Sequence, residues 1–407
     1  MGSKNDVVVI GYARTAFDKF GGVCKDLPSS QLGKLVISEL VNRVKIAAAE
    51  IDDVNLGLCM FGEAVTQTDI IARQALLHAG LSDETLSNNI DRACCSSTTA
   101  LQQSMKNLKL GEANVSIAMG VDNMSRVALY VPPEYRWNGS RLGDVKLVDM
   151  LFNFGVPGFG VLAVDAGEVA LENGVSRQEQ DEWAVRSQDR YAQADEKGFI
   201  KGEIFPIEIP QGKKNPPVIF EKDANPRPGI TLEKLAQLPT IYNSPTMTAG
   251  NSPGLGTGAS GVITTTRGKA DSLGIKPLAT IVDVVSIATK PRDIAVAPAV
   301  AIKKALCKTG LSLQDLSVIE INEAFAAMPL VSTKILGDGD KALTNKIREI
   351  SNVDGGAIAV GHPVGASGLR ITMHAIEVLR RNGGGTGIAT ICGGLAQGDA
   401  VVIKVEG

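Results

Sequence analysis

The sequence has no uninterrupted apolar run of the ~18 residues that a membrane-spanning helix needs. Its first residues, MGSKNDVVVIGYARTAF, lead directly into an apolar strand pattern, without the charged and apolar regions of a signal peptide. The net charge is only −3, which predicts no basic surface for nucleic acid or an anionic membrane. We therefore expect a cytoplasmic protein that binds neither membrane nor nucleic acid.

The cysteines lack the spacing of a disulfide framework or of a metal site. The chain has 6 cysteines and 3 histidines, and no CxxC or HxxH motif occurs. A chain of 407 residues buries enough apolar surface to fold without covalent cross-links. These observations predict free thiols in a reducing compartment and no bound metal.

The composition is that of a compact α/β protein, and the chain repeats itself. Glycine occurs 44 times, and 44% of the residues are hydrophobic. Residues 36–58 and 298–321 share the pattern of a helix, a turn and a short strand. Residues 88–120 and 351–394 share a strand, a turn of small residues, a long helix and a buried strand. The sequence therefore predicts two similar α/β halves that share a site where they meet.

The repeats divide the chain into three parts. We expect one half at residues 1–120, completed by 250–268, and the other at 269–407. The segment 121–249 between them is rich in turn formers and contains a helix whose start is marked by Ser176 and Glu179. It is predicted to be an inserted loop or lid domain.

Cys94 occupies a small-residue turn, RACCSSTTALQ, in front of a helix. A thiol at a helix N-terminus faces free backbone N–H groups and the positive end of the helix dipole, which favours the nucleophilic thiolate. The alternative is ordinary packing, and we assign that structural role to the neighbouring Cys95.

His362 stands in a glycine-rich loop, GGAIAVGHPVGASG, that also leads into a helix. Its imidazole titrates near neutral pH and is suited to accept a proton from a thiol. Glycines are expected to let substrate approach and to leave the ring unobstructed. His78 and His374 lie in apolar-periodic helices and are interpreted as ordinary helix histidines.

Two further strand ends carry candidate groups. Cys392 ends a strand in ATICGGLAQG, where the backbone N–H groups of the following turn can stabilise an oxyanion. Asn322 follows the strand in VIEINEAFA and is suited to hold a water molecule. For Asn322 and Glu323 the alternative is a solvated strand end without function.

Together these motifs resemble the thiolase family. NEAFA (322–326), the His362 loop and Cys392 followed by Gly393 and Gly394 are similar to three C-terminal motifs of that family. RACCSS is similar to the turn of its nucleophilic cysteine, and TAGN (248–251) to its coenzyme A-binding turn. The resemblance implies an α/β protein with the duplicated five-layer α/β/α/β/α fold, an inserted loop domain, and a homodimer or homotetramer.

The resemblance also implies a role for each residue. Cys94 attacks an acyl-CoA thioester with His362 as its base, and Cys392 exchanges a proton with the α-carbon of the second substrate. One oxyanion hole is formed by His362 and a water on Asn322, and the other by the N–H groups of Cys94 and Gly394. Arg227, Leu238 and Ala249 match positions that contact coenzyme A, which acts as a substrate carrier and not as a permanently bound cofactor.

Several positions depart from the family pattern. Cys95, Ser97, Pro253 and the Leu395–Ala396 pair replace other residues in these motifs, while Val161, Leu162 and Ile294 stand at acyl-pocket positions. Three functions stay open. The favoured one is acetyl-CoA C-acetyltransferase, which interconverts two acetyl-CoA and acetoacetyl-CoA plus coenzyme A. The others are a 3-ketoacyl-CoA thiolase for longer or branched chains and a non-catalytic acyl-CoA-binding relative.

Overall fold

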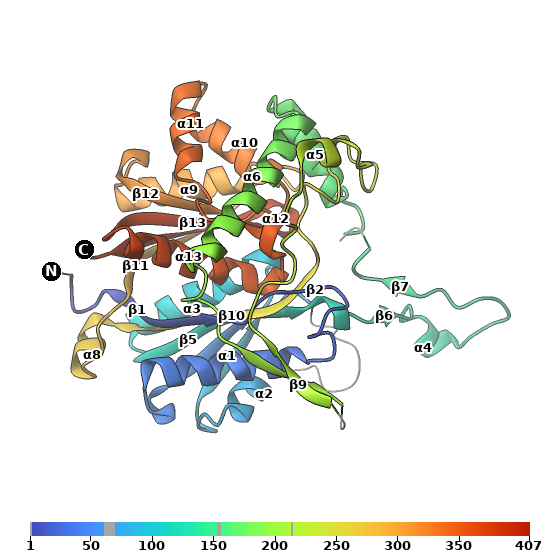
Figure 1. The fold of residues 1–407 in the computed structure, drawn as a ribbon. Helices are drawn as coiled ribbons and strands as arrows, with labels where there is room; N and C mark the ends of the chain where they lie inside the picture. The colour runs from blue at the N-terminus through green and yellow to red at the C-terminus, as the bar shows by residue number, and fades with distance from the viewer. Residues whose placement is uncertain (1, 61–69, 153–155, 213–214) are drawn as a thin grey trace.

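A mixed ten-stranded sheet runs through the centre of the molecule, with helices between and outside its two halves (Figure 1). The computed structural model describes residues 2–60, 70–152, 156–212 and 215–407. Residues 1, 61–69, 153–155 and 213–214 lie outside the described residues, and so do the parts of the predicted ranges 1–120 and 121–249 that contain them. Nine strands follow the order β12-β13-β14-β11-β1-β10-β5-β3-β4, and β2 (Asp18–Lys19) pairs with β10.

The N-terminal half consists of five strands with helices on both faces. Its elements are β1 (Val7–Arg14), α1 (Ser29–Val44), β3 (Asp53–Gly57), α2 (Ile71–His78), β4 (Leu86–Ile90), α3 (Ser96–Leu110), β5 (Val115–Asn123) and β10 (Gly256–Thr266). Helix α1 forms because Leu32, Val36 and Leu40 recur at helical spacing, and all three are fully buried against the sheet. Burying each contributes ~1.5–3 kcal/mol of transfer free energy.

The C-terminal half repeats this arrangement. Its elements are β11 (Ala279–Ala288), α9 (Ala297–Thr309), β12 (Leu316–Ile321), α10 (Ala327–Leu336), α11 (Lys341–Glu349), α12 (Ala357–Val360), α13 (Ser367–Arg381), β13 (Gly385–Gly393) and β14 (Gln397–Val405). In the N-terminal half, β1 pairs with β10 and β10 with β5 in antiparallel orientation, and β5 pairs with β3 in parallel. The C-terminal half has the same order of orientations: β11·β14 and β14·β13 are antiparallel, and β13·β12 is parallel. The predicted duplication is confirmed.

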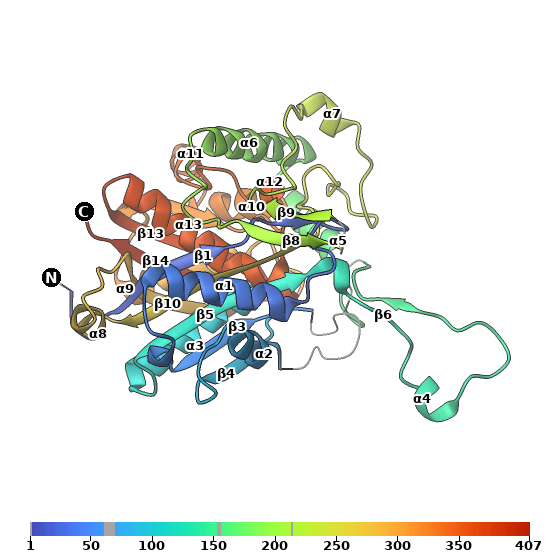
Figure 2. The same ribbon diagram turned by 60° about the horizontal axis from the view of Figure 1, so that its bottom comes forward.

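Helices α3 and α13 lie together in the middle of the molecule. They pack on each other, and α3 covers one half of the sheet while α13 covers the other. Helices α1 and α2 lie outside the first half, and α9 and α10 outside the second (Figure 2). This confirms the predicted five layers. In addition, β1 pairs directly with β11 at Val8 and Val9, which joins the two halves into one sheet.

The segment 121–249 packs on both halves and also extends away from them. An arm containing β6 (Leu129–Tyr130), α4 (Tyr135–Asn138) and β7 (Val148–Asp149) projects from the body (Figures 1 and 2). Helices α5 (Leu162–Glu172), α6 (Arg177–Glu196) and α7 (Leu232–Ala236) lie over the C-terminal half, with the predicted capping box at the start of α6. The hairpin β8 (Ile207–Gln211) and β9 (Asn215–Phe220) packs on the N-terminal half. The domain limits 121–249, 250–268 and 269–407 remain predictions.

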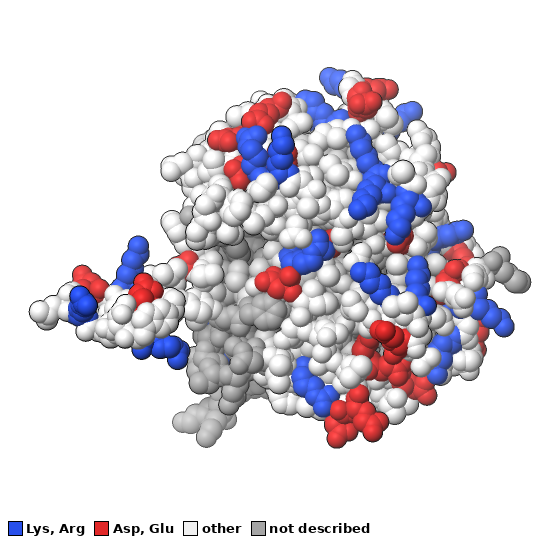
Figure 3. All heavy atoms as spheres, turned by 180° about the vertical axis from the view of Figure 1, so that it is seen from behind, with Lys and Arg blue, Asp and Glu red and all other residues white. Residues whose placement is uncertain are grey.

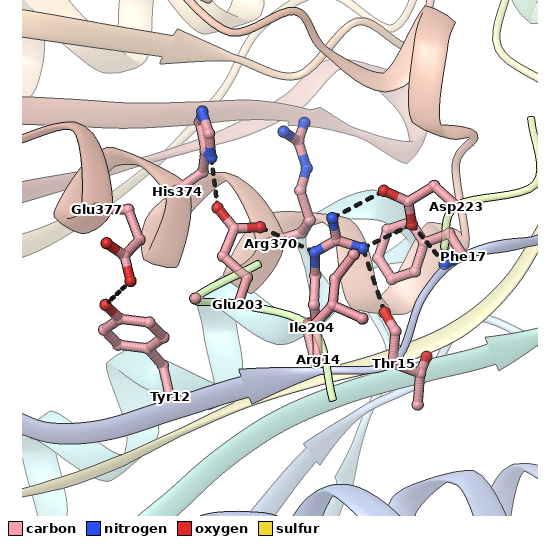
Figure 4. Close-up of polar contacts among 12 residues, drawn as sticks. Tyr12, Arg14, Thr15, Phe17, Glu203, Ile204, Asp223, Arg370, His374 and Glu377 are labelled. Atoms are coloured by element: carbon pink, nitrogen blue, oxygen red, sulfur yellow. Dashed lines mark hydrogen bonds and ion pairs between the residues drawn. The ribbon is translucent and has the colours of Figure 1, made fainter. Parts of the chain in front are cut away.

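Buried charged side chains connect β1, the inserted segment and α13 (Figure 4). The Arg14 guanidinium donates to Glu203 at 2.9 Å and to both carboxylate oxygens of Asp223 at 2.8 and 2.9 Å. Glu203 also binds His374 on α13. His374 lies in a helix as predicted, and in addition its ring lies between the buried carboxylates of Glu203 and Asp354.

The surface and the helices agree with the charge and hydropathy of the sequence. None of the helices within the described ranges is long and apolar enough to cross a membrane. On the face drawn in Figure 3, basic and acidic side chains are interspersed, and the projecting arm carries both signs. Across the same described ranges, no three His, Cys, Asp or Glu side chains converge as a metal site.

Candidate active site

Cys94 lies in a single 3-10 turn, Ala93–Cys95, between β4 and α3. The chain enters this turn through Ala93, whose φ of 50° is in the left-handed region that disfavours a side chain. The Ala93 N–H donates to Asp91 Oδ1 at 2.8 Å, which holds the turn. The Cys94 side chain remains partly accessible, whereas Cys95 is fully buried with its thiol 3.6 Å from the Ile391 carbonyl.

His362 is brought to Cys94 from the other half of the molecule. Nε2 of His362 lies 3.3 Å from Sγ of Cys94. On the other side of the ring, Nδ1 lies 2.6 Å from Oγ of Ser367, and this hydroxyl donates to the Pro363 carbonyl at 2.9 Å. Since the Ser367 proton is used, its oxygen accepts from Nδ1–H. The ring therefore presents an unprotonated Nε2 to the thiol.

Two glycines near His362 are required because neighbouring protein atoms leave no room for a side chain, and not because substrate must pass there. A Cβ at Gly368 would lie 2.7 Å from Thr98 of α3, and one at Gly361 would overlap Asn225. The expectation that these glycines open the loop for substrate is therefore wrong at both positions. They allow α13 and the His362 loop to approach their neighbours closely enough for the ring to reach Cys94.

Both members of the pair are neutral in the resting protein. Burial raises the pKa of the Cys94 thiol well above its usual range, and nearby Cys392 and Asp122 act in the same direction. The backbone N–H of Cys94 lowers the pKa only in part. The expectation that the helix N-terminus stabilises a thiolate is wrong, because the cost of burying the charge is larger. Burial, followed by the charge of Arg370, lowers the pKa of His362 to about 3.

Cys392 ends β13 next to this pair. Its side chain is 1% exposed, and burial raises the pKa of its thiol to about 12. The turn that carries Cys94 packs against β13 and against the turn Gly394–Ala396 that follows Cys392. A Cβ at Gly394 would lie 3.1 Å from the Ala93 Cβ, so Gly394 is adjacent to the Cys94 turn.

Asn322 follows β12 as predicted, and its side-chain amide has no hydrogen-bond partner among the described residues. It is fully buried, yet neither Nδ2 nor Oδ1 forms a hydrogen bond to the described residues. A buried amide without partners costs free energy, so this amide is suited to bind a water or a substrate.

The neighbouring Glu323 has a different role from a solvated strand end, and that alternative is wrong. Its buried carboxylate accepts from Trp183 at 2.8 Å, Ser187 at 2.7 Å and Asn352 at 3.0 Å. It also accepts from the N–H of Ile358 in α12 at 3.1 Å. Glu323 thus fixes α6 against the segment that leads to His362.

The candidate coenzyme A residues cluster at the turn Thr248–Asn251. Arg227 Nη1 donates to the Ala249 carbonyl at 3.0 Å, and a Cβ at Gly250 would lie 2.7 Å from Leu238. Arg227 and Ala249 are exposed, and Leu238 is partly exposed. From this turn the chain continues to Gly254, whose carbonyl accepts the His362 N–H at 3.0 Å. The same short stretch of backbone therefore contacts both the predicted coenzyme A residues and the loop that carries His362.

Sequence reasoning missed several supporting residues. Ser367 was interpreted only as part of the small-residue loop, although it is the first residue of α13, five residues after His362. Ser97 accepts the N–H of Leu369 at 3.2 Å and links α3 to α13. Glycine at position 120 leaves room for the Ser97 side chain, since a Cβ at Gly120 would lie 2.6 Å from the Ser97 Cβ.

Comparison with known families identifies the fold and its chemistry. The model described as "Thiolase, N-terminal domain" matches residues 7–268, and "Thiolase, C-terminal domain" matches 275–405. The chain belongs to the thiolase family. The predictions of a thiolase fold and of an acyltransferase are thereby confirmed.

Relatives align with this thiolase over nearly their whole length. The acetyl-CoA acetyltransferase of Syntrophomonas wolfei is 37% identical over 406 residues, covering 98% of this chain and 99% of the relative. That of Pseudomonas aeruginosa is 37% identical over 402 residues, with the same coverage. The crystal structure of human mitochondrial 3-ketoacyl-CoA thiolase in complex with CoA superposes with a TM-score of 0.90 at 33% identity, covering 99% of both chains.

Proposed function

We propose that this thiolase is an acetyl-CoA C-acetyltransferase that acts through an acyl group on Cys94. The observation that carries the proposal is the contact of 3.3 Å between Cys94 Sγ and an unprotonated His362 Nε2. The adjacent Cys392 supplies a second acid–base group, and Asn322 an unsatisfied amide. The names of the acetyl-CoA acetyltransferases at 34–37% identity support acetyl-CoA as the substrate.

In the first half-reaction the Cys94 proton passes to His362 Nε2 as sulfur attacks the thioester carbonyl. The carbon–sulfur bond to coenzyme A breaks, and the departing sulfur takes the proton from His362. Because the resting thiol and imidazole are both neutral, proton transfer accompanies attack and does not precede it. The products are acyl-Cys94 and free coenzyme A.

In the second half-reaction an α-carbon of acetyl-CoA replaces Cys94 at the acyl carbon. Cys392 takes the α-proton, and one proton finally returns to the Cys94 sulfur, so the step is neutral overall. The resting Cys392 is a thiol, and in the reverse direction this form protonates the carbanion that leaves during thiolysis. For condensation we propose that the Cys392 thiol first passes its proton to His362. The Cys392 thiolate then takes the α-proton and His362 returns a proton to the departing Cys94 sulfur, so all three groups end as they began.

Charge that develops on the carbonyl oxygens needs hydrogen-bond donors. We assign one oxyanion site to His362 and a water held by Asn322, and the other to the N–H groups of Cys94 and Gly394. The unpartnered amide of Asn322 supports the first assignment, and the close packing of Gly394 on the Cys94 turn supports the second.

Coenzyme A is proposed to bind over the turn Thr248–Asn251. Arg227 supplies a cation for its phosphates, and Leu238 and Ala249 offer partly exposed apolar contacts. A solved structure named as a complex with CoA has the same fold, which supports coenzyme A as the ligand. No permanently bound cofactor enters the reaction.

Acetoacetyl-CoA thiolysis, followed through the loss of enolate absorbance, tests this proposal. Turnover that falls from C4 to C10 substrates is expected for an acetyl-CoA C-acetyltransferase. Faster cleavage of the longer or branched 3-ketoacyl-CoA would favour the broader thiolase activity, for which Cupriavidus necator beta-ketothiolase BktB at 35% identity is a relative. Coenzyme A binding without turnover would instead identify a non-catalytic acyl-CoA-binding protein.

We also propose a cytoplasmic homodimer or homotetramer. The arm exposes many large apolar side chains, which on a protein surface often mark a contact with another chain. These side chains are Leu129, Val131, Trp137, Leu142, Leu147, Met150 and Phe152. All six cysteines lie within the described ranges and are free thiols, which fits a reducing compartment. Analytical ultracentrifugation tests the assembly, and a purely monomeric protein would contradict it.

A further inference from the structure

We propose that the Arg92–Asp399 ion pair is a positioning device that sets the spacing of the Cys94 and Cys392 sulfurs. The inference rests on the proposed roles of those two cysteines and extends them to side chains that touch neither substrate. Arg92 lies two residues before Cys94, and Asp399 lies on β14 opposite Ile391, the residue before Cys392. Arg92 thus belongs to the segment that carries Cys94, and Asp399 to the strand paired with the one that carries Cys392.

Several short hydrogen bonds hold the Arg92 and Asp399 side chains in place. Arg92 Nη1 lies 2.9 and 3.0 Å from the two Asp399 carboxylate oxygens and 2.6 Å from Thr99 Oγ1. Asp399 is fully buried and also accepts from Thr98 Oγ1 at 2.6 Å. The carboxylate therefore holds both the residue before the Cys94 turn and the first turn of α3.

A second connection runs from Arg92 to the turn after Cys392. Arg92 Nε donates to Gln397 Oε1 at 3.0 Å, and Gln397 Nε2 donates to the Gly394 carbonyl at 3.4 Å. The backbone of Arg92 is close to the same turn, because a Cβ at Gly393 would lie 3.1 Å from its carbonyl oxygen. Arg92 thus contacts the Cys392 segment through both side chain and main chain.

The Cys94 turn and the turn after Cys392 both contain strained backbone, which explains why the Arg92–Asp399 ion pair is needed to hold them. Ala93 has φ 50°, and Leu395 and Ala396 have φ 54° and 56°. A residue with a side chain is disfavoured in the left-handed region, and such conformations persist only when their surroundings hold them. Without the ion pair the two turns can relax independently, which changes the distance between acyl-Cys94 and Cys392.

Two reactions separate this role from general support of the fold. Exchange of labelled coenzyme A into acetyl-CoA uses Cys94, His362 and the oxyanion donors but not Cys392, whereas acetoacetyl-CoA thiolysis also uses Cys392. Loss of spacing by about 1 Å is expected to lower the thiolysis kcat on the order of 10–100-fold. Exchange is expected to fall by about tenfold less than thiolysis, because it does not require the spacing between Cys94 and Cys392.

Two variants test the positioning role of the Arg92–Asp399 ion pair without leaving a buried charge unpaired. Arg92→Lys keeps the charge and loses the multiple donors of the guanidinium, and the double variant Arg92→Met with Asp399→Leu removes both charges. Arg92→Lys remains informative if the double variant does not fold. The matched control is Lys308→Gln with Asp283→Asn, which removes an ion pair of 2.6 Å elsewhere on the neighbouring β11.

A selective loss of thiolysis in both Arg92 variants, absent in the control, is the expected result. Equal loss of exchange and thiolysis, or no loss of either, would overturn the positioning role. A wild-type protein that performs neither reaction would overturn the proposed function itself, so the two failures are distinguishable.

Discussion

Ser367 Oγ lies 2.6 Å from His362 Nδ1 and at the same time donates its proton to the Pro363 carbonyl at 2.9 Å. One hydroxyl therefore determines which ring nitrogen carries the proton. Because the raised pKa keeps the Cys94 thiol neutral, the reaction depends on a base that is already in the right tautomer. The helix α13 that carries Ser367 is consequently part of the catalytic arrangement.

Replacing Ser367 by alanine is expected to slow acylation of Cys94 by about 10²-fold, because the ring then adopts either tautomer and can rotate. Single-turnover formation of acyl-Cys94 from acetyl-CoA measures this rate, and Ser367→Thr should restore most of it. Ser332→Ala, which removes another buried hydroxyl 3.2 Å from the Ala295 carbonyl, is the control. Equal rates in Ser367→Ala and Ser332→Ala would refute the tautomer assignment.

Asn322→Ala is expected to lower kcat by about 10²–10³-fold, since it removes the group assigned to an oxyanion site. Its thermal stability should be unchanged or higher, because the amide has no hydrogen bond to lose to any residue that the structure describes. The contrast is Asn352→Ala: this amide binds the Ile321 N–H and carbonyl at 2.8 Å each, so stability should fall. A stability loss in Asn322→Ala equal to that in Asn352→Ala would contradict the assignment.

Gly368→Ala is expected to destabilise the protein by about 1–3 kcal/mol, because the new Cβ would lie 2.7 Å from Thr98 Cγ2. The clash separates α3 from α13 and therefore Cys94 from His362, so activity should fall as well. Adding Thr98→Ser removes the contacted methyl group and should restore part of both properties. Gly268→Ala, whose Cβ meets nothing closer than 3.4 Å, is the control and should be tolerated in chemical denaturation.

Stability should fall as pH rises above neutrality because of His374. Burial alone lowers the His374 pKa, but Glu203 and Asp354 outweigh it and raise the value from 6.5 to about 10. The folded protein therefore retains a proton that the unfolded chain releases, so this contribution is complete below pH 6.5 and lost as pH rises through 10.

The partner Glu203 acts at the acidic end. Burial opposes the shift, but His374 and Arg14 lower the Glu203 pKa from 4.5 to about 2, so its contribution is present above pH 4.5 and lost as pH falls through 2. His374→Gln should flatten the urea midpoint between pH 6.5 and 10, whereas the exposed His78→Gln should not. An unchanged slope in His374→Gln would show that the ring is not charged in the folded protein.

The repeat pattern predicted the duplicated fold because each strand and helix is encoded by local apolar spacing. It also predicted the turns that carry Cys94 and His362, since matching turns of a duplication meet across the seam. The supporting contacts were not predictable in this way. Arg92 and Asp399 are separated by 307 positions, so no local pattern connects them. The protonation of Cys94 was predicted wrongly because a helix N-terminus is visible in sequence while the depth of burial is not.

The central claim is that Cys94, and no other thiol, carries the acyl group. Incubation with acetyl-CoA followed by peptide mass spectrometry tests it most directly in wild type, Cys94→Ala and Cys95→Ala. We predict an acetylated peptide containing Cys94 in wild type and in Cys95→Ala, and none in Cys94→Ala. An acetyl thioester that persists in Cys94→Ala, at Cys95 or Cys392, would contradict the account.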